Sequence, residues 1–415
     1  MTETIGLPKL KIAFEAAAQA AANRSKRGYV GLIVRDEKAQ GLHKLSSDAM
    51  IPMELGEANK AHIKTAFEGS DRGRPSLVYL AVVPPDGEQG AGTPDCGHEI
   101  AGDGEVREML DEVFQRTASG GGGPETQEGP ETSVPSKTAA LEGGLKLLSA
   151  VSLDYLAPPP DVTEEELAAL ETWVKAQRAA YRPVKLVRPA PAGEQGSDDM
   201  GIIDWDEPGL EALGKAVAPA GYCARMAGIL AGIPMSMSAT YVALPEVTAV
   251  TERSEAEQAS AINAGRLILI HDGQKAKIAR AVNSLVTIPP KGKSDWRFIK
   301  IVEGMDLITY YLRTTIEDSY VGRYANTYDN KQLLVAEVLE YLQYLERAGV
   351  LNPGQSFCRI DYEAQLRYLK SQGVETADLT ERQVLEYQTD SWVFLRCGGR
   401  LANAMEDFEV LFNNL

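Results

Sequence analysis

Histidine and cysteine, which supply many metal ligands and nucleophiles, are scarce in this sequence. The chain has four of each among its 415 residues. Cys96 and His98 would provide only two of the four ligands of a zinc site. No CxxC motif occurs, and Cys223, Cys358 and Cys397 are widely scattered. We therefore expect reduced cysteines, no metal site and no secreted disulfide framework.

Long apolar runs and basic clusters are missing as well. No stretch reaches the roughly 20 apolar residues of a membrane-spanning helix. Ala16–Ala22 is short, alanine-rich and followed by basic residues, unlike a signal peptide. The chain has 59 acidic and 42 basic residues, a formal charge of -17, which argues against binding nucleic acid or an anionic membrane. We expect a protein made and kept in the cytosol, unless a lysing cell releases it.

Motifs of catalysis are also absent. Gly120–Gly123 has no strand before it and no Gly-Lys-Ser/Thr after it, so we interpret it as a linker and not as a phosphate loop. Glu164–Glu166 form an acidic first helical turn, which the helix dipole favours. Glu317 and Asp318 would point about 100° apart on a helix and form no carboxylate dyad. We predict no catalytic residue, no cofactor and no enzymatic activity.

Helices and strands alternate in the first half of the chain, which favours an α/β unit with parallel pairing. A capping box at Thr163 and Glu166 opens one helix, which Pro183 stops. We expect strands at Leu77–Val83, Asp154–Ala157 and Val184–Val187, an apolar run at Tyr29–Val34, and helices at Asn59–Phe67 and Thr138–Val151.

The second half is richer in helices. Leu267–Ile270, a turn at Asp272-Gly273 and Lys275–Thr287 predict a β-hairpin, with His271 as a turn residue. A group of tyrosines from Tyr310 to Tyr344 fits either a core or a protein contact. We expect helices at Tyr222–Ala231, Ile299–Tyr324, Asp329–Gly349 and Ile360–Lys370, a capping box at Thr380 and Gln383, and strands at Trp392–Cys397 and Phe408–Phe412.

The tract Pro84–Ser136 differs in composition from the rest. It contains 12 acidic and 2 basic residues, 11 glycines and 6 prolines. Such a segment cannot bury enough apolar surface to offset the entropy of ordering it. We interpret it as an insertion that forms a solvated loop or flexible linker.

Seven stretches form an ordered set of motifs: Tyr222–Pro234, Ser238–Tyr241, Leu267–Gly273, Ala281–Leu285, Lys300–Ile308, Tyr328–Lys331 and Ala404–Asp407. Together with Gly6–Pro8 and Arg24–Gly28, they resemble the tail sheath family of Gram-positive defective phages and phage-tail-like bacteriocins. The likeness covers Gly6–Val83 and Thr138–Leu415, and the acidic insertion departs from the family pattern. None of the motifs is catalytic.

The resemblance implies an α+β or α/β fold, with a sheath core domain built from both chain ends, an inserted α/β domain and extended terminal β arms. The expected divisions are residues 1–28 (N-terminal arm), 29–83 (first α/β region), 84–136 (insertion), 137–210 (outer α/β domain), 211–390 (core domain) and 391–415 (C-terminal strands and arm).

The resemblance also implies a function. Subunits would stack as hexameric rings around an inner tube, and contraction of the sheath would drive that tube through a target envelope. The partners would be further copies of this chain, the tube protein, and baseplate and tail terminator proteins. An α/β enzyme of unknown substrate and a non-contractile scaffold are the alternatives.

Two sets of residues are candidates for assembly contacts. Alternating apolar residues in the terminal segments would add strands to neighbouring subunits, because strand addition satisfies backbone groups that lack a local partner. They are Leu10, Ile12, Phe14, Val393, Leu395, Phe408, Val410 and Phe412. In the core, Glu317, Asp318 and Arg323 would face charges on the tube.

Overall fold

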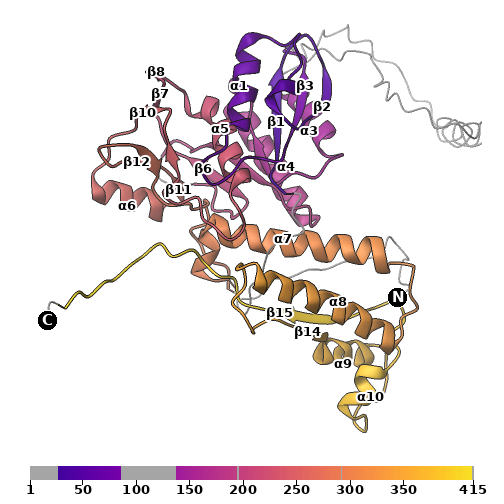
Figure 1. The fold of residues 1–415 in the computed structure, drawn as a ribbon. Coiled ribbons are helices and arrows are strands. Elements are labelled where there is room, and N and C mark those ends of the chain that lie inside the picture. Colours follow the sequence, from indigo (N-terminus) through magenta and orange to yellow (C-terminus); the bar gives the residue numbers. More distant parts are fainter. Residues whose placement is uncertain (1–26, 86–136, 194–195, 291, 414–415) are drawn as a thin grey trace, which may run out of the picture.

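The computed structural model describes residues 27–85, 137–193, 196–290 and 292–413. They form an α/β part and a mainly helical C-terminal part that lies beside it (Figure 1). The predicted strand at Leu10, Ile12 and Phe14 falls outside the described residues, as do Cys96, His98 and Gly120–Gly123.

A seven-stranded sheet is the centre of the α/β part. Its strand order is β11-β6-β5-β4-β1-β3-β2, and all neighbours are parallel except β2 and β3. The predicted parallel pairing is therefore confirmed, and regions 29–83 and 137–210 share one sheet. The bounds are β1 Tyr29–Arg35, β2 Gly41–Leu45, β3 Leu77–Val83, β4 Tyr155–Ala157, β5 Lys185–Pro189, β6 Ile202–Trp205 and β11 Arg266–Leu267.

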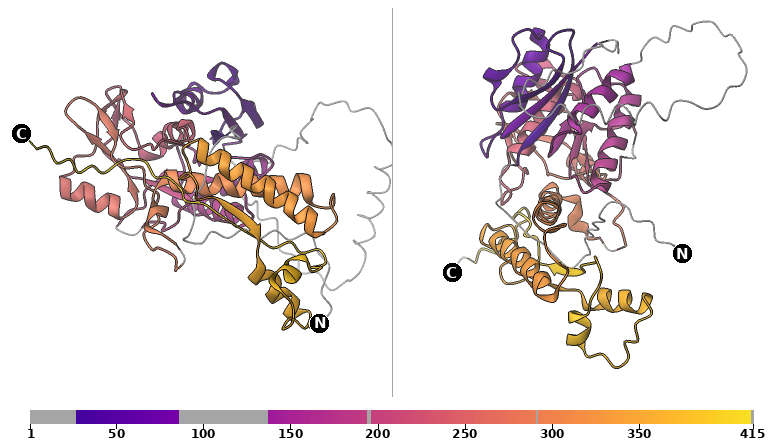
Figure 2. Two further views of the ribbon diagram at one scale, coloured as in Figure 1. Left: turned by 60° about the horizontal axis from the view of Figure 1, so that its bottom comes forward. Right: turned by 90° about the vertical axis from the view of Figure 1, so that its right-hand side faces the viewer.

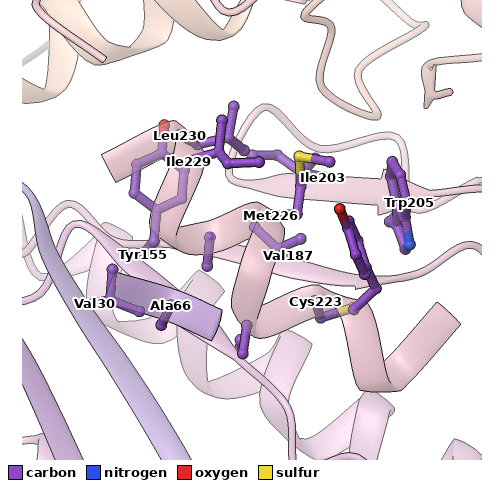
Figure 3. Close-up of a cluster of buried hydrophobic side chains, with 14 of the residues drawn as sticks. Val30, Ala66, Tyr155, Val187, Ile203, Trp205, Cys223, Met226, Ile229 and Leu230 are labelled. Atoms are coloured by element: carbon purple, nitrogen blue, oxygen red, sulfur yellow. The ribbon is translucent and has the colours of Figure 1, made fainter. Parts of the chain in front are cut away.

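Helices cover both faces of this sheet, which explains why β1 and β3 are apolar at nearly every position. Helices α1 (Glu57–Phe67) and α5 (Pro219–Gly232) bury one face, and Figure 3 shows side chains of α5 against Tyr155, Val187 and Ile203. Helices α3 (Lys137–Leu148) and α4 (Glu164–Ala179) bury the other (Figure 2). The predicted capping box of α4 is present.

Short strands and one helix form the edge of this part. One small sheet contains β10 (Val247–Ala249), β7 (Glu211–Ala212) and β8 (Lys215–Ala216), and another contains β12 (Leu269–His271), β13 (Ala276–Ile278) and β9 (Ala243–Leu244). Helix α6 spans Glu255–Asn263. The predicted hairpin is confirmed in β12 and β13, but its second strand ends at Ile278 and not at Thr287.

The C-terminal part begins with a helix most of whose residues are buried. Helix α7 spans Ile299–Thr315 and continues as a π-helical turn at Ile316–Tyr320. Helix α8 (Tyr328–Arg347) buries Leu334, Val338, Leu342 and Leu345, as its periodicity predicts. The part is completed by β14 (Phe357–Ile360), α9 (Tyr362–Ser371), α10 (Glu381–Glu386) and β15 (Leu395–Gly398).

Several predicted boundaries in this part are wrong. Ile360 ends β14, because Asp361 caps α9 by accepting a hydrogen bond from the Ala364 N–H. The predicted helix Ile299–Tyr324 stops before Arg323, which lies in a turn. The strand predicted at Trp392–Cys397 begins only at Leu395.

Candidate functional site

Where the chain is described, no three His, Cys, Asp or Glu side chains gather as a metal site would require. A hollow of about 400 Å³ lies between the two parts, and its lining includes no histidine or cysteine. Two of its charged residues, Arg27 and Glu303, are already paired with Asp154 and Lys185. Nor is any helix within the described ranges long and apolar enough to cross a bilayer.

The candidate polar residues have structural roles. Glu166 completes the capping box of α4 and pairs with Arg35. The Nδ1 atom of His271 accepts a hydrogen bond from the Gly273 N–H within the hairpin turn. The tyrosine group is divided, since Tyr311 and Tyr341 stack in the core while Tyr310 and Tyr324 are exposed.

A buried ionic cluster joins the two parts of the molecule. The Lys185 ammonium of β5 lies 2.7 Å from Glu303 and 2.9 Å from Asp306, both on α7. Arg178 of α4 donates two hydrogen bonds to Asp306, at 2.8 and 2.9 Å. Burial opposes ionisation of Asp306, but the charges of Arg178 and Lys185 lower its pKa well below the usual range. The cluster thus fixes α7 against the sheet.

The C-terminal segment is the most exposed apolar region of the described chain. Residues 402–413 contain no helix or strand and run away from the body (Figure 1). The strand predicted at Phe408–Phe412 is not formed in the single chain, because no strand among the described residues pairs with it. Its exposed apolar side chains are Met405, Phe408, Val410, Leu411 and Phe412, each at least 75% exposed.

This segment is held at its base by charged and polar contacts. The Arg280 guanidinium donates to Glu406 at 3.1 Å and also pairs with Asp407. The Thr240 hydroxyl donates to Glu406 at 2.8 Å and accepts from the Ala281 N–H at 2.9 Å. The Glu406 side chain is only 6% exposed. The chain is therefore fixed at Glu406, two residues before the run of exposed apolar side chains that begins at Phe408.

A second contact lies just before this anchor. Lys300, at the start of α7, donates to the Ala402 carbonyl. Burial lowers the pKa of Lys300 to about 8, and the nearby Glu406 charge acts in the opposite direction. Motifs far apart in the sequence, around residues 240, 281, 300 and 404, thus meet at one place. Sequence reasoning singled out these motifs but missed the roles of Arg280, Glu406 and Lys300.

A two-stranded sheet carries another of the candidate residues. Leu395 lies in β15, which pairs antiparallel with β14, and Val393 precedes that strand. Leu395 therefore has a local partner, Ile360, contrary to the expectation that this segment lacks one. On the outer face of the sheet, Phe357 and Arg396 are exposed. No further strand pairs with this sheet among the described residues.

The candidate charges at the end of α7 lie on the surface. Glu317 and Asp318 are exposed in the π-helical turn, and Glu317 pairs with Arg313 one helical turn earlier at 3.0 Å. Arg323 is exposed in the turn that follows. The three side chains come from one short surface segment, but only two of them lie on a helix.

Comparisons with known proteins agree with this architecture. Residues 292–412 match the family described as the phage tail sheath C-terminal domain. The tail sheath protein of Clostridium phage phiCD119 is 26% identical over 409 residues, which are 98% of each chain.

Solved structures show the same fold. The sheath tail protein of Desulfitobacterium hafniense has a TM-score of 0.60 at 15% identity, covering 85% of this chain and 94% of its own. The contracted helical sheath of the anti-feeding prophage has a TM-score of 0.58 at 13% identity, covering 100% and 99%. The resemblance inferred from the sequence is therefore confirmed: this chain has the fold of tail sheath proteins, with a segment matching the phage tail sheath C-terminal domain.

Proposed function

We propose that this chain is a structural subunit of a contractile tail sheath and not an enzyme. Subunits polymerise as stacked hexameric rings around an inner tube, and contraction of the polymer drives the tube through a target cell envelope. The observation that carries the proposal is the anchored, exposed apolar C-terminal segment, in a chain whose relatives are sheath proteins.

The C-terminal segment supports assembly through strand addition. In an extended conformation Phe408, Val410 and Phe412 lie on one side of the chain. Left alone, they expose apolar surface that a folded neighbour would bury. A neighbour's sheet edge, such as that of β14 or β15, offers the backbone partners that the segment lacks within its own chain. Contacts of this head-to-tail kind generate open helical polymers.

The remaining partners follow from the same role. Of the predicted core, residues 211–390, the helical part from α7 onward lies nearest the tube protein, with Glu317, Asp318 and Arg323 as candidate tube contacts. The α/β domain faces outward, and baseplate and tail terminator proteins cap the polymer. The N-terminal arm, with Leu10, Ile12 and Phe14, forms the second link between subunits. Assembly takes place in the bacterial cytoplasm, and lysis releases the particle.

Electron microscopy of the full chain tests this function. The parent protein is expected to form helical assemblies of six-fold symmetry, in long and short forms when particles contract. The triple variant Phe408→Ser/Val410→Ser/Phe412→Ser is expected to keep the melting curve of the parent, because these side chains are at least 75% exposed in the single chain. It is expected to lose the polymer.

The control variant changes the other side of the same segment. Glu409→Ser/Asn413→Ser is expected to leave assembly intact, because both positions point away from the shared apolar side. A triple variant that still builds a contractile sheath would contradict the linking role of this segment. A parent protein that forms only small closed oligomers across salt and concentration would favour the enzyme alternative, and polymers of one fixed length would favour the scaffold.

A further inference from the structure

Two of the described cysteines lie directly opposite each other in the C-terminal sheet. Cys358 of β14 and Cys397 of β15 are partners in the antiparallel register, and both thiols are free (Figure 1 shows the two strands). They are 39 positions apart in the sequence, so no spacing motif joins them. Opposed residues of two strands project to the same face of the sheet.

The hydrogen-bond pattern of the sheet places this pair where the strands approach most closely. Asp361 donates its N–H to the Phe394 carbonyl, so that opposed pair is hydrogen-bonded. Bonded and non-bonded pairs alternate along an antiparallel ladder. Cys358 lies three positions before Asp361 on β14, so Cys358 and Cys397 form a non-hydrogen-bonded pair. The Cα atoms of such a pair lie roughly 4.5 Å apart. Disulfides form at Cα separations of about 4.4 to 6.8 Å.

The surroundings hold these two thiols together against one hydrophobic cluster. Cys358 is 8% exposed and belongs to the cluster that packs on α8, and the partly exposed Cys397 packs against the same cluster. A hydrogen bond with Cys358, followed by burial, raises the pKa of the Cys397 thiol. The two thiols thus face each other within a mainly apolar site. Cys223, by contrast, is fully buried inside α5.

We propose that Cys358 and Cys397 form a redox-sensitive pair that closes into a disulfide when the protein meets a low-molecular-weight disulfide such as oxidised glutathione. The Cys397 thiolate attacks one glutathione sulfur, forms a mixed disulfide and releases one glutathione thiolate. The Cys358 thiolate then attacks the Cys397 sulfur and releases the second glutathione. Two protein thiols are oxidised, one glutathione disulfide is reduced, and the two protons pass to the glutathione thiolates.

Closure would lock the sheet from which the C-terminal segment departs. The new bond would join residues 358 and 397, enclosing α9 and α10 in a covalent loop. A cross-link of this kind restricts the unfolded chain and so stabilises the folded one. In a reducing cytoplasm the pair stays open, and outside the cell it closes.

Peptide mapping of the full-length protein tests the pair directly. The protein is reduced, transferred to a buffer containing oxidised glutathione, denatured in an alkylating reagent and digested with trypsin. We expect a disulfide-linked peptide that joins residues 348–359 to residues 397–400, with loss of alkylation at both cysteines. Cys223 remains fully alkylated as the internal control. Closure is expected to be faster at higher pH, because more of the Cys397 thiol is then ionised.

Two variants keep the experiment decisive. In Cys358→Ser the linked peptide is expected to disappear. Oxidation is expected to raise the melting temperature of the parent by roughly 5 °C or more and to leave that of Cys397→Ser unchanged. Cys358 and Cys397 that stay fully alkylated under oxidant, or that pair with a different cysteine, would overturn the proposal. Neither outcome depends on polymerisation, so the proposal stands or fails separately from the sheath function.

Discussion

Lys185, Arg178 and Asp306 illustrate, at the scale of single residues, how charge holds this molecule together. Lys185 is 0% exposed, and its ammonium lies within 2.9 Å of two carboxylates. A buried ion pair adds little stability compared with apolar residues, but removing one carboxylate leaves more buried positive charge than the remaining partner compensates. The cluster should therefore be sensitive to single substitutions.

Asp306→Asn keeps the volume of the side chain and removes the charge that Arg178 and Lys185 face. We expect a loss of about 3–5 kcal/mol in the free energy of unfolding, measured by denaturant titration. The control is Glu317→Gln, which breaks the half-exposed pair with Arg313 and should change stability by less than about 1 kcal/mol. Equal effects of the two substitutions would show that the buried cluster does not hold α7 against the sheet.

His62 predicts a pH dependence of stability. Burial lowers the pKa of His62 to about 4, and a hydrogen bond to the Gly221 backbone acts in the opposite direction. Between pH 6.5 and 4 only the unfolded chain binds a proton at this position. Stability therefore falls as the pH falls through this window, by about 3 kcal/mol in total.

Replacing His62 isolates that contribution. In His62→Gln the difference in unfolding free energy between pH 6.5 and pH 4 should be smaller than in the parent by about this amount, since all other groups titrate alike. Parallel pH profiles for the two proteins would mean that His62 is protonated equally in both states.

At the scale of secondary-structure elements, the contact between α1 and α5 explains part of the motif Tyr222–Pro234. A Cβ atom on Gly228 would lie 2.0 Å from the Ala66 carbonyl oxygen of α1. Because that atom belongs to the backbone, it cannot rotate away. The glycine therefore lets the two helices approach each other, which is a packing role and not a catalytic one.

Gly228→Ala should destabilise the protein by about 1–3 kcal/mol through this overlap. Gly143→Ala is the matched control, since Gly143 also lies within a helix but has open space where its Cβ would be. It should raise stability by up to about 1 kcal/mol, because alanine favours the helix. Thermal melts of both variants measure the difference in stability. A Gly228→Ala variant as stable as the parent would show that α1 and α5 can move apart without loss of stability.

Sequence patterns located most elements but not every boundary. The apolar face of α8 and the capping boxes at Thr163 and Thr380 are local features, so they are confirmed as predicted. The sequence contains a signal that predicts the end of β14, because Asp361 is a suitable N-cap for α9. The alternation at Phe408–Phe412 shows only that a strand is compatible with the segment, since a strand also requires an edge to pair with.

At the scale of the whole molecule, the acidic tract can be separated from the fold. Val83 at the end of β3 and the α3 residues Ala140 and Leu141 belong to one hydrophobic cluster, so the chain leaves and re-enters the α/β part at neighbouring elements. Residues 86–136 lie outside the described ranges. Their composition predicts that they add little to stability.

Replacing residues 86–136 with a short Gly/Ser linker should leave both the melting temperature and the polymer intact. Closing a shorter loop is entropically no harder than closing a long one. A control in which the tract is scrambled at constant composition should behave in the same way. Loss of assembly in the linker variant, seen by microscopy, would reveal that the tract makes structural contacts.

The sequence by itself determined the alternating α/β unit, the helix ends marked by caps, the absence of a catalytic motif and the likeness to sheath proteins. These features depend on residues near one another in the chain. Only the tertiary structure decided that Arg280 holds Glu406, that Lys185 meets Asp306 and that Cys358 faces Cys397. Each of these pairs joins residues from segments far apart in the sequence. No periodicity or spacing relates such residues, and the packing of those elements alone brings the side chains within bonding distance.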